Sequence, residues 1–350
     1  MLRFAADSAP PTLRPKFRMQ GSWSYDTLNC TTHEPPQEID LDDGMFLPVS
    51  FLTQNGSNHP AIVSRAYFVA VERILKPVCD KYGWALDHSK SSCVRVKVRH
   101  GAHIDIALYA IPDHDFHELL EKAFTDSISS FSAFDERPAF DELYARLPVD
   151  HIMLAHREEG WKPSDPRKLE DWFRDAIARH GYQLRRVCRY LKAWRDFHWQ
   201  GCRLSSIALM ACAVAAFNEA YGQFDNARDD KALLIVAERL PSLLSGQIVN
   251  PVVDGQRLDE GWDDCRTDFV AQAEALRDTL QSILASSNRG AAVTSLAALM
   301  GHYMPTDLDY LSIEVLDGGP AILRSGLLKE LGDEPTARES VKVGGDERYG

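Results

Sequence analysis

The chain of 350 residues lacks paired cysteines, long apolar runs and a positive charge balance. Its seven cysteines are scattered without a Cys-x-x-Cys pair, which argues against a zinc or redox motif and fits a reducing cytosol. The net charge of -12 argues against a constitutive nucleic-acid binder, because phosphate contacts dominate that affinity. The longest apolar run, Ile207–Phe217, is too short to span a bilayer and predicts a helix buried on all sides.

The first residues also lack a signal-peptide pattern, since they include Arg3, Asp7 and several prolines. We therefore expect a cytoplasmic protein with no membrane partner and no obligatory nucleic acid. A chain of this length, 45% hydrophobic, can bury a large core and is predicted to form two lobes. We place the first lobe at residues 1–150, the second at 151–331, and a polar, flexible tail at 332–350.

Acidic residues on two predicted strands are the main chemical signal. Residues two apart on a strand share a face, so Asp40 and Asp42 project together. In His103–Tyr109 the apolar residues take one face and Asp105 takes the other. If these strands are neighbours, three carboxylates converge and repel one another unless a cation lies among them. Such oxygen ligands suit Mg²⁺, although an Asp-x-Asp pair alone is often solvated turn chemistry.

A Gly-Ser pair precedes these acids. Gly21 lets the backbone approach a phosphate without a Cβ clash, and the Ser22 hydroxyl can hold a phosphate oxygen. The order Gly-Ser, Asp-x-Asp and a lone strand Asp is more specific than any one part. His103 lies close to Asp105 in sequence, and we expect a core or rim histidine there, not a metal ligand.

Periodicity predicts several further elements. Cys93–Arg99 alternates valines with basic residues and reads as a half-buried strand, whose Arg95 faces either solvent or the nucleotide cleft. Helices are predicted at Ile62–Tyr82, Tyr182–His198, Asp268–Leu284 and Ala291–Met304.

Several polar residues near these helices each have two possible roles. Ser164 and Asp165 precede Pro166, which favours a helix cap, and capping is compatible with nucleotide contact. A basic stripe formed by Arg185, Arg189 and Lys192 is either a solvated face or, through Lys192, a phosphate ligand. Ser205 and Ser206 open the buried helix, and either of them is suited to be its N-cap.

Sequence stretches in both predicted lobes resemble one family. The first are Gln20–Asn29, Ile39–Pro48 and His103–Pro112, and the later ones are His156–Arg167, Arg189–Asp196, Leu204–Met210 and Asn250–Val252. They are similar to the bacterial DncV-like cyclic GMP-AMP synthases, which belong to the cGAS/DncV-like (CD-NTase) nucleotidyltransferases. The resemblance extends from about Met19 to about Leu311.

This resemblance implies an α+β fold with two lobes. A polymerase-β-like nucleotidyltransferase palm with a mixed sheet would pair with a C-terminal helical lobe, and the active site would lie in the cleft between them. Asp40, Asp42 and Asp105 would be catalytic and would hold two Mg²⁺ ions, with Mn²⁺ as a substitute. The residues implied in nucleotide binding are Gln20, Gly21, Ser22, Tyr25, Arg95, Ser164, Asp165, Lys192, Ser205 and Ser206.

The resemblance further implies that ATP and GTP are joined into 3′,3′-cyclic GMP-AMP. This second messenger would activate a downstream effector in anti-phage defence (CBASS). Some relatives are joined to targets through their C-terminal residue by ubiquitin-like conjugation enzymes, and the terminal Gly350 suits that chemistry.

One feature departs from the family pattern. Members usually carry a long helical brace before the Gly-Ser strand, whereas the 19 residues before Gln20 include Pro10, Pro11 and Pro15. Either the chain is a mis-started or truncated version, or this member lacks the brace. Two other functions remain open: a template-independent RNA nucleotidyltransferase, and a non-catalytic homologue that holds nucleotide.

Overall fold

A computed structural model describes residues 15–33, 36–54, 57–113, 151–301 and 307–308. Three expectations fall outside these residues: the missing N-terminal brace, the lobe boundary at residue 150 and the tail at 332–350. They stay predictions.

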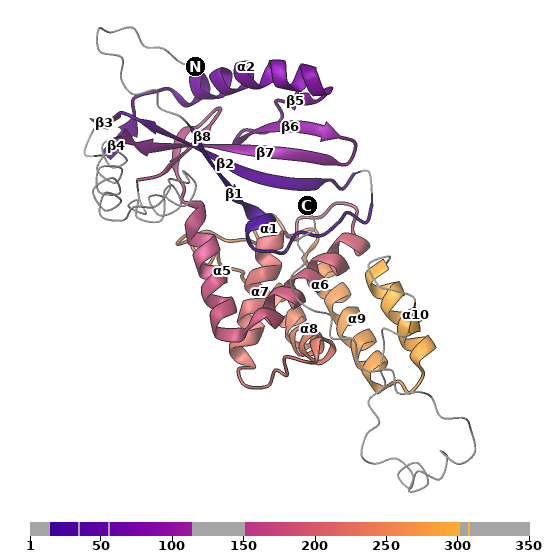
Figure 1. Cartoon of the computed structure of the whole chain (residues 1–350). Coiled ribbons are helices and arrows are strands. Elements are labelled where there is room, and N and C mark those ends of the chain that lie inside the picture. The colour runs from indigo at the N-terminus through magenta and orange to yellow at the C-terminus, as the bar shows by residue number, and fades with distance from the viewer. Residues whose placement is uncertain (1–14, 34–35, 55–56, 114–150, 302–306, 309–350) are drawn as a thin grey trace, which may run out of the picture.

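A mixed seven-stranded sheet forms the first half of the molecule (Figure 1). Its strands are β1 (Lys16–Gln20), β2 (Ile39–Val49), β5 (Ala85–Asp87), β6 (Cys93–Arg99), β7 (Ala102–Pro112), β8 (Met153–His156) and β9 (Gly160–Pro163). The order is β1-β2-β7-β6-β5, while β8 pairs with β7 and β9 pairs with β8. Only the β2–β7 pairing among these is parallel. A separate hairpin joins β3 (Phe51–Gln54) to β4 (Ser57–Pro60).

Helix α2 (Ser64–Tyr82) covers one face of this sheet (Figure 1). Alternate strand residues point to it, and Met45, Val94 and Leu108 pack with Phe68 of the helix. The predicted strand Cys93–Arg99 is confirmed at both ends, and the predicted helix begins at Ser64, two residues later than expected.

The second half is helical and lies on the other side of the sheet (Figure 1). Its helices are α5 (Pro166–His180), α6 (Tyr182–His198), α7 (Ser206–Glu219), α8 (Asp229–Ser245), α9 (Arg266–Ala285) and α10 (Arg289–Met300). All six contribute buried residues to one core. Helix α7 holds the apolar run Ile207–Phe217 and buries eight residues, which confirms a largely buried helix. It is not buried on all sides, because Ile207, Ala211 and Ala215 are partly exposed.

The segment after β1 joins the sheet to the helices. It begins with the short helix α1 (Gly21–Ser24) and runs across to α6. Arg18 contacts Glu170 of α5 at 3.2 Å, and the Gln37 amide donates to the Asp196 carbonyl at 2.7 Å. The Asn29 amide donates to the Arg189 carbonyl at 2.9 Å. The predicted α+β class, with a sheet half and a helical half, is thus confirmed.

Candidate metal and nucleotide site

The parallel pairing of β2 with β7 brings the predicted acids together. The register sets Asp42 beside Asp105 and Asp40 beside His103, so all four lie on the face away from α2. One ligand atom each from Asp40, His103 and Asp105 lies within 4.8 Å of the others. The predicted convergence is confirmed for Asp40 and Asp105, while Asp42 lies on the same face but is not a member of this group.

Gly21 closes one side of this acidic cluster. Its φ is +65°, a conformation that costs glycine little. A Cβ at this position would lie 2.0 Å from Asp42 Oδ2, so no side chain fits between the α1 backbone and the carboxylate. Glycine is required here by both conformation and space.

Arg95 reaches the cluster from the next strand, β6. Its Nε and Nη2 each donate to an Asp105 oxygen at 2.6 Å, and both side chains are largely buried. Arg95 therefore does not lie on a solvated face, and its contact with a nucleotide stays a prediction. Lys97, two residues on, instead pairs with Asp87 at 2.9 Å and is half exposed.

Burial makes the ionisation of Asp40 and Asp42 unfavourable. It raises the pKa of Asp42 to about 7, with the charges of Asp40 and Asp105 adding to the effect. The pKa of Asp40 is raised by burial first and by Asp105 second. Asp40 Oδ1 is buried and has no hydrogen-bond partner. Buried carboxylate oxygens gathered in this way fit a hard divalent cation such as Mg²⁺.

His103 also belongs to the cluster, with only 5% of its side chain exposed. Its Nδ1 lies 2.8 Å from Glu38 Oε2, and its Nε2 lies 2.9 Å from Asp40 Oδ1. The expected buried histidine is confirmed, but its contacts with Glu38 and Asp40 were not predicted. One sequence feature indicated that His103 lies near the acids: it is two residues from Asp105, so both side chains share one face of the strand.

The predicted helix caps are confirmed for Asp165 and Ser205. Asp165 accepts from the Arg167 backbone N–H at the start of α5 and is also ion-paired with the Arg167 side chain. Ser205 caps α7 by accepting from the Ala208 N–H, while Ser206 Oγ accepts from Arg195 at 3.0 Å. Ser164 directly precedes Asp165. Nucleotide contact by these residues stays a prediction.

The basic stripe of α6 faces the segment at residues 26–29. Lys192 Nζ donates to the Thr27 carbonyl, and Arg185 pairs with Asp26 at 2.9 Å. The basic stripe therefore joins the helical half to the segment after β1. Neither of the two interpretations of the stripe, a solvated face or a phosphate ligand, predicted this. Burial, followed by the charge of Arg195, lowers the pKa of Lys192 to about 8. Lys192 acts electrostatically on Asp42, so its charge is felt at the acidic cluster.

Gln20 and Tyr25 lie on either side of α1. Gln20 Oε1 accepts a hydrogen bond from the Tyr109 hydroxyl at 3.2 Å. The Tyr25 ring meets Phe173 edge-on, with 6.1 Å between ring centroids. Burial raises the pKa of the Tyr25 hydroxyl, and the charges of Glu170 and Asp42 add to the effect. Tyr25 thus lies between the acidic cluster and α5.

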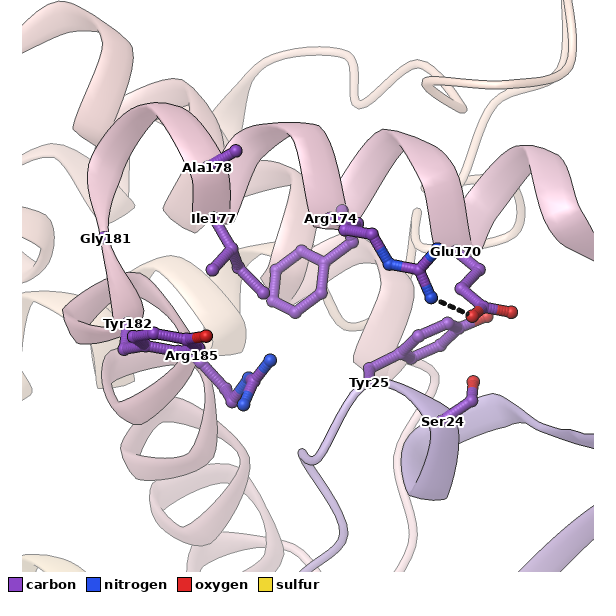
Figure 2. Close-up of a pocket in the computed structure, with 10 residues that line it drawn as sticks. Ser24, Tyr25, Glu170, Arg174, Ile177, Ala178, Gly181, Tyr182 and Arg185 are labelled. Atoms are coloured by element: carbon purple, nitrogen blue, oxygen red, sulfur yellow. Dashed lines mark hydrogen bonds and ion pairs between the residues drawn. The ribbon is translucent and has the colours of Figure 1, made fainter. Parts of the chain in front are cut away.

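A pocket of about 460 Å³ opens on the other side of Tyr25 (Figure 2). It is lined by Ser24, Tyr25, Glu170, Phe173, Arg174, Ile177, Ala178, Gly181, Tyr182 and Arg185. Figure 2 shows Arg174 bonded to Glu170, and the Arg185 guanidinium stands 5.0 Å from the centre of the Tyr182 ring. The three acids are not part of this lining, so the pocket adjoins the acidic cluster without containing it.

The sheet, its acidic face and the helical half together define the nucleotidyltransferase class. Two family models match: the nucleotidyltransferase domain of DncV-like cyclic GMP-AMP synthases at residues 15–109, and the cyclic GMP-AMP synthase C-terminal domain at residues 181–312. These spans cover more than half of the chain, which belongs to the DncV-like family.

Individual relatives agree with this assignment. The chain is 33% identical over 253 residues to a cyclic GMP-AMP synthase of Vibrio cholerae, a match that covers 68% of this chain and 55% of the relative. The V. cholerae DncV structure with the linear intermediate 5′ pppA(3′,5′)pG is similar, with a TM-score of 0.70 and 28% identity over 87% of this chain and 73% of that one. A DncV mutant in complex with ATP, GTP and 5MTHFGLU2 gives a TM-score of 0.73 and 28% identity, covering 87% of this chain and 74% of that one.

The chain spans about half the length of the curated relatives that it matches. Among the described residues, no helix combines the length and the apolar character needed to cross a membrane.

Proposed function

We propose that this chain is a nucleotidyltransferase that joins ATP and GTP into a cyclic dinucleotide, 3′,3′-cyclic GMP-AMP. The observation that carries the proposal is the meeting of Asp40, Asp42 and Asp105 on one face of the sheet, directly beside Gly21. Relatives named cyclic GMP-AMP synthases support the choice of product. The proposal includes the two lobes at residues 1–150 and 151–331.

The three carboxylates would hold two Mg²⁺ ions, which when bound activate the attacking ribose hydroxyl and neutralise the leaving pyrophosphate. Asp40 and Asp42 would serve both ions. Asp105 would be the carboxylate nearest the attacking hydroxyl and would help to remove its proton. Arg95, which is paired with Asp105, would contribute a cation to the nucleotide site. Most of the rate enhancement comes from alignment and charge neutralisation.

The nucleotide is held from both halves of the molecule. Gly21 and Ser22 bring backbone N–H groups and a hydroxyl to the donor triphosphate, and Gly21 is the position where only a bare backbone fits. Lys192 and Ser206 approach the phosphates from the helical half. Gln20, Tyr25, Ser164, Asp165 and Ser205 complete the proposed lining. A cyclic product needs two rounds, in which a linear intermediate turns over before its free hydroxyl attacks.

The test is to incubate the purified chain with labelled ATP, GTP, CTP and UTP in the presence of Mg²⁺ and to separate the products by chromatography. The proposal predicts a cyclic dinucleotide that contains adenine and guanine. A polymer would instead identify a template-independent RNA nucleotidyltransferase. Absence of any product from a folded sample that binds nucleotide would identify a non-catalytic homologue.

A role in anti-phage defence follows from the product. The cyclic dinucleotide would activate a downstream effector, and ubiquitin-like conjugation enzymes would act on the tail at residues 332–350. Deleting residues 338–350 should then leave cyclisation unchanged and prevent conjugates on denaturing gels. Conjugates that persist after the deletion would contradict this use of the tail.

A further inference from the structure

His103 is a buried imidazole placed among three carboxylates. It lies two residues from Asp105 on the same face of β7 and opposite Asp40 of β2. We propose that His103 is a direct nitrogen ligand for a divalent transition metal at this site, beside Asp40 and Asp105. The inference rests on the proposed metal-dependent function and deepens it, because it adds a ligand and sets a metal preference.

The contact with Glu38 occupies one side of the ring. Nδ1 lies 2.8 Å from Glu38 Oε2, so Nε2 is on the side of the ring away from Glu38. A metal would bind the ring through Nε2, in the tautomer whose proton is on Nδ1. Metal-binding histidines are usually supported in this way, with a carboxylate on the ring nitrogen that does not touch the metal.

Nε2 itself is aimed at the acidic cluster. It lies 2.9 Å from Asp40 Oδ1 and 4.0 Å from Asp105 Oδ1. The distance to Asp40 is within reach of an ion pair, yet its geometry makes no hydrogen bond, and both atoms are buried without a hydrogen-bond partner. A metal ion placed between these two buried atoms would bind both and give each a partner.

The spacing of these atoms suits one shared ion. Ligands about 2.1 Å from an octahedral ion stand roughly 3 Å apart when adjacent and about 4.2 Å apart when opposite. The 2.9 Å and 4.0 Å separations approach these values. Imidazole favours transition metals over Mg²⁺, whereas carboxylates suit Mg²⁺ and Mn²⁺ alike. The mixed set therefore favours Mn²⁺ over Mg²⁺. In the competing arrangement, His103 is an imidazolium counter-ion of Asp40 and does not touch the metal.

Pulsed electron paramagnetic resonance separates the two arrangements. The full chain with one equivalent of Mn²⁺ should show the coupling of a directly bound nitrogen, and its absence from wild type would overturn the proposal. His103→Gln should remove this coupling and weaken Mn²⁺ binding about tenfold or more. Its Mg²⁺ affinity should change by less than about threefold, because Mg²⁺ relies on the oxygen ligands.

His156→Gln is the matched control, since His156 is a second buried histidine, placed on β8 away from the acids. This variant should keep the nitrogen coupling, and coupling that survives in His103→Gln would overturn the assignment. Product formation by the same preparation is measured separately. Nitrogen coupling without any cyclic dinucleotide would sustain the ligand and refute the synthase, while product without coupling would do the reverse.

Discussion

The two faces of the sheet are built from alternate residues of the same strands, yet one face is apolar and the other is acidic. Leu108 and Met45 point to α2 and lie in a closely packed apolar cluster. Asp105 and Asp42, on the same two strands, point the other way, and burial opposes the charge of Asp42. One face supplies stability, and the other holds reactive groups whose cost the first must offset.

The acidic face is itself divided along the strands. Asp40, Asp42 and Asp105 lie near the beginnings of β2 and β7, while Phe46 and Tyr109 stack further along, with ring centroids 4.6 Å apart. Charge is thus confined to the end beside α1 and α6, where the Gly-Ser element and Lys192 are also found. The difference teaches that the chemical site is a local exception on an otherwise well-packed sheet.

Removing charge from the acidic face should have the largest effect on function. Asp40→Asn together with Asp42→Asn should lower product formation by about a thousandfold or more, because metal and phosphate alignment is lost. Chromatography of labelled products gives the rate, and circular dichroism should show an unchanged fold. Wild-type turnover by this variant would refute the site.

Truncation on the opposite face should act on stability. Leu108 is fully buried, so Leu108→Ala should lower the free energy of unfolding by about 2–5 kcal/mol through lost burial and a cavity. Urea unfolding gives the value. A loss below about 1 kcal/mol would mean that the α2 face is not the stabilising one.

The pH dependence of the free energy of unfolding tests whether ionisation on the acidic face destabilises the fold. Because the folded pKa of Asp42 is raised to about 7, the native state binds more protons than the unfolded state between about pH 4 and 7. The Asp42 contribution to stability therefore falls as pH rises through that window. Without divalent cations, Asp42→Asn should be more stable than wild type at pH 8 by about 1–2 kcal/mol. A difference between the two unfolding curves that does not vary with pH would contradict the assignment.

The helical half should contribute a smaller effect on binding. Lys192→Ala and Ser206→Ala should each weaken ATP and GTP binding about tenfold, the loss expected for one hydrogen bond to a charged group. Arg189→Ala is the control from the same basic stripe, and calorimetric titration gives the affinities. Unchanged affinity in both test variants would limit Lys192 and Ser206 to joining the two halves.

Local patterns predicted the parts of this molecule that depend on local geometry. The alternation in Cys93–Arg99, the period of α6 and the same-face pairing of Asp40 with Asp42 all follow from spacing along one element. The cap formed by Asp165 before Pro166 is equally local.

What the patterns could not supply were partners distant in sequence. Lys192 meets Thr27, and Arg18 meets Glu170, only because the chain returns across the sheet. The direction of the Arg95 side chain could not be predicted, because the alternation in one strand does not say whether its basic face is exposed to solvent. The Glu38 contact of His103 depends on the parallel register of β2 with β7, which no single strand specifies.

The central claim, that the face away from α2 is a metal and nucleotide site, is tested most directly by anomalous scattering. Crystals grown with Mn²⁺ and a non-reactive ATP analogue would locate the ions without reference to activity. The account predicts two Mn²⁺ peaks bound by Asp40, Asp42 and Asp105, with the triphosphate beside Gly21 and Ser22. Ions and nucleotide bound elsewhere, with these three carboxylates unligated, would contradict it.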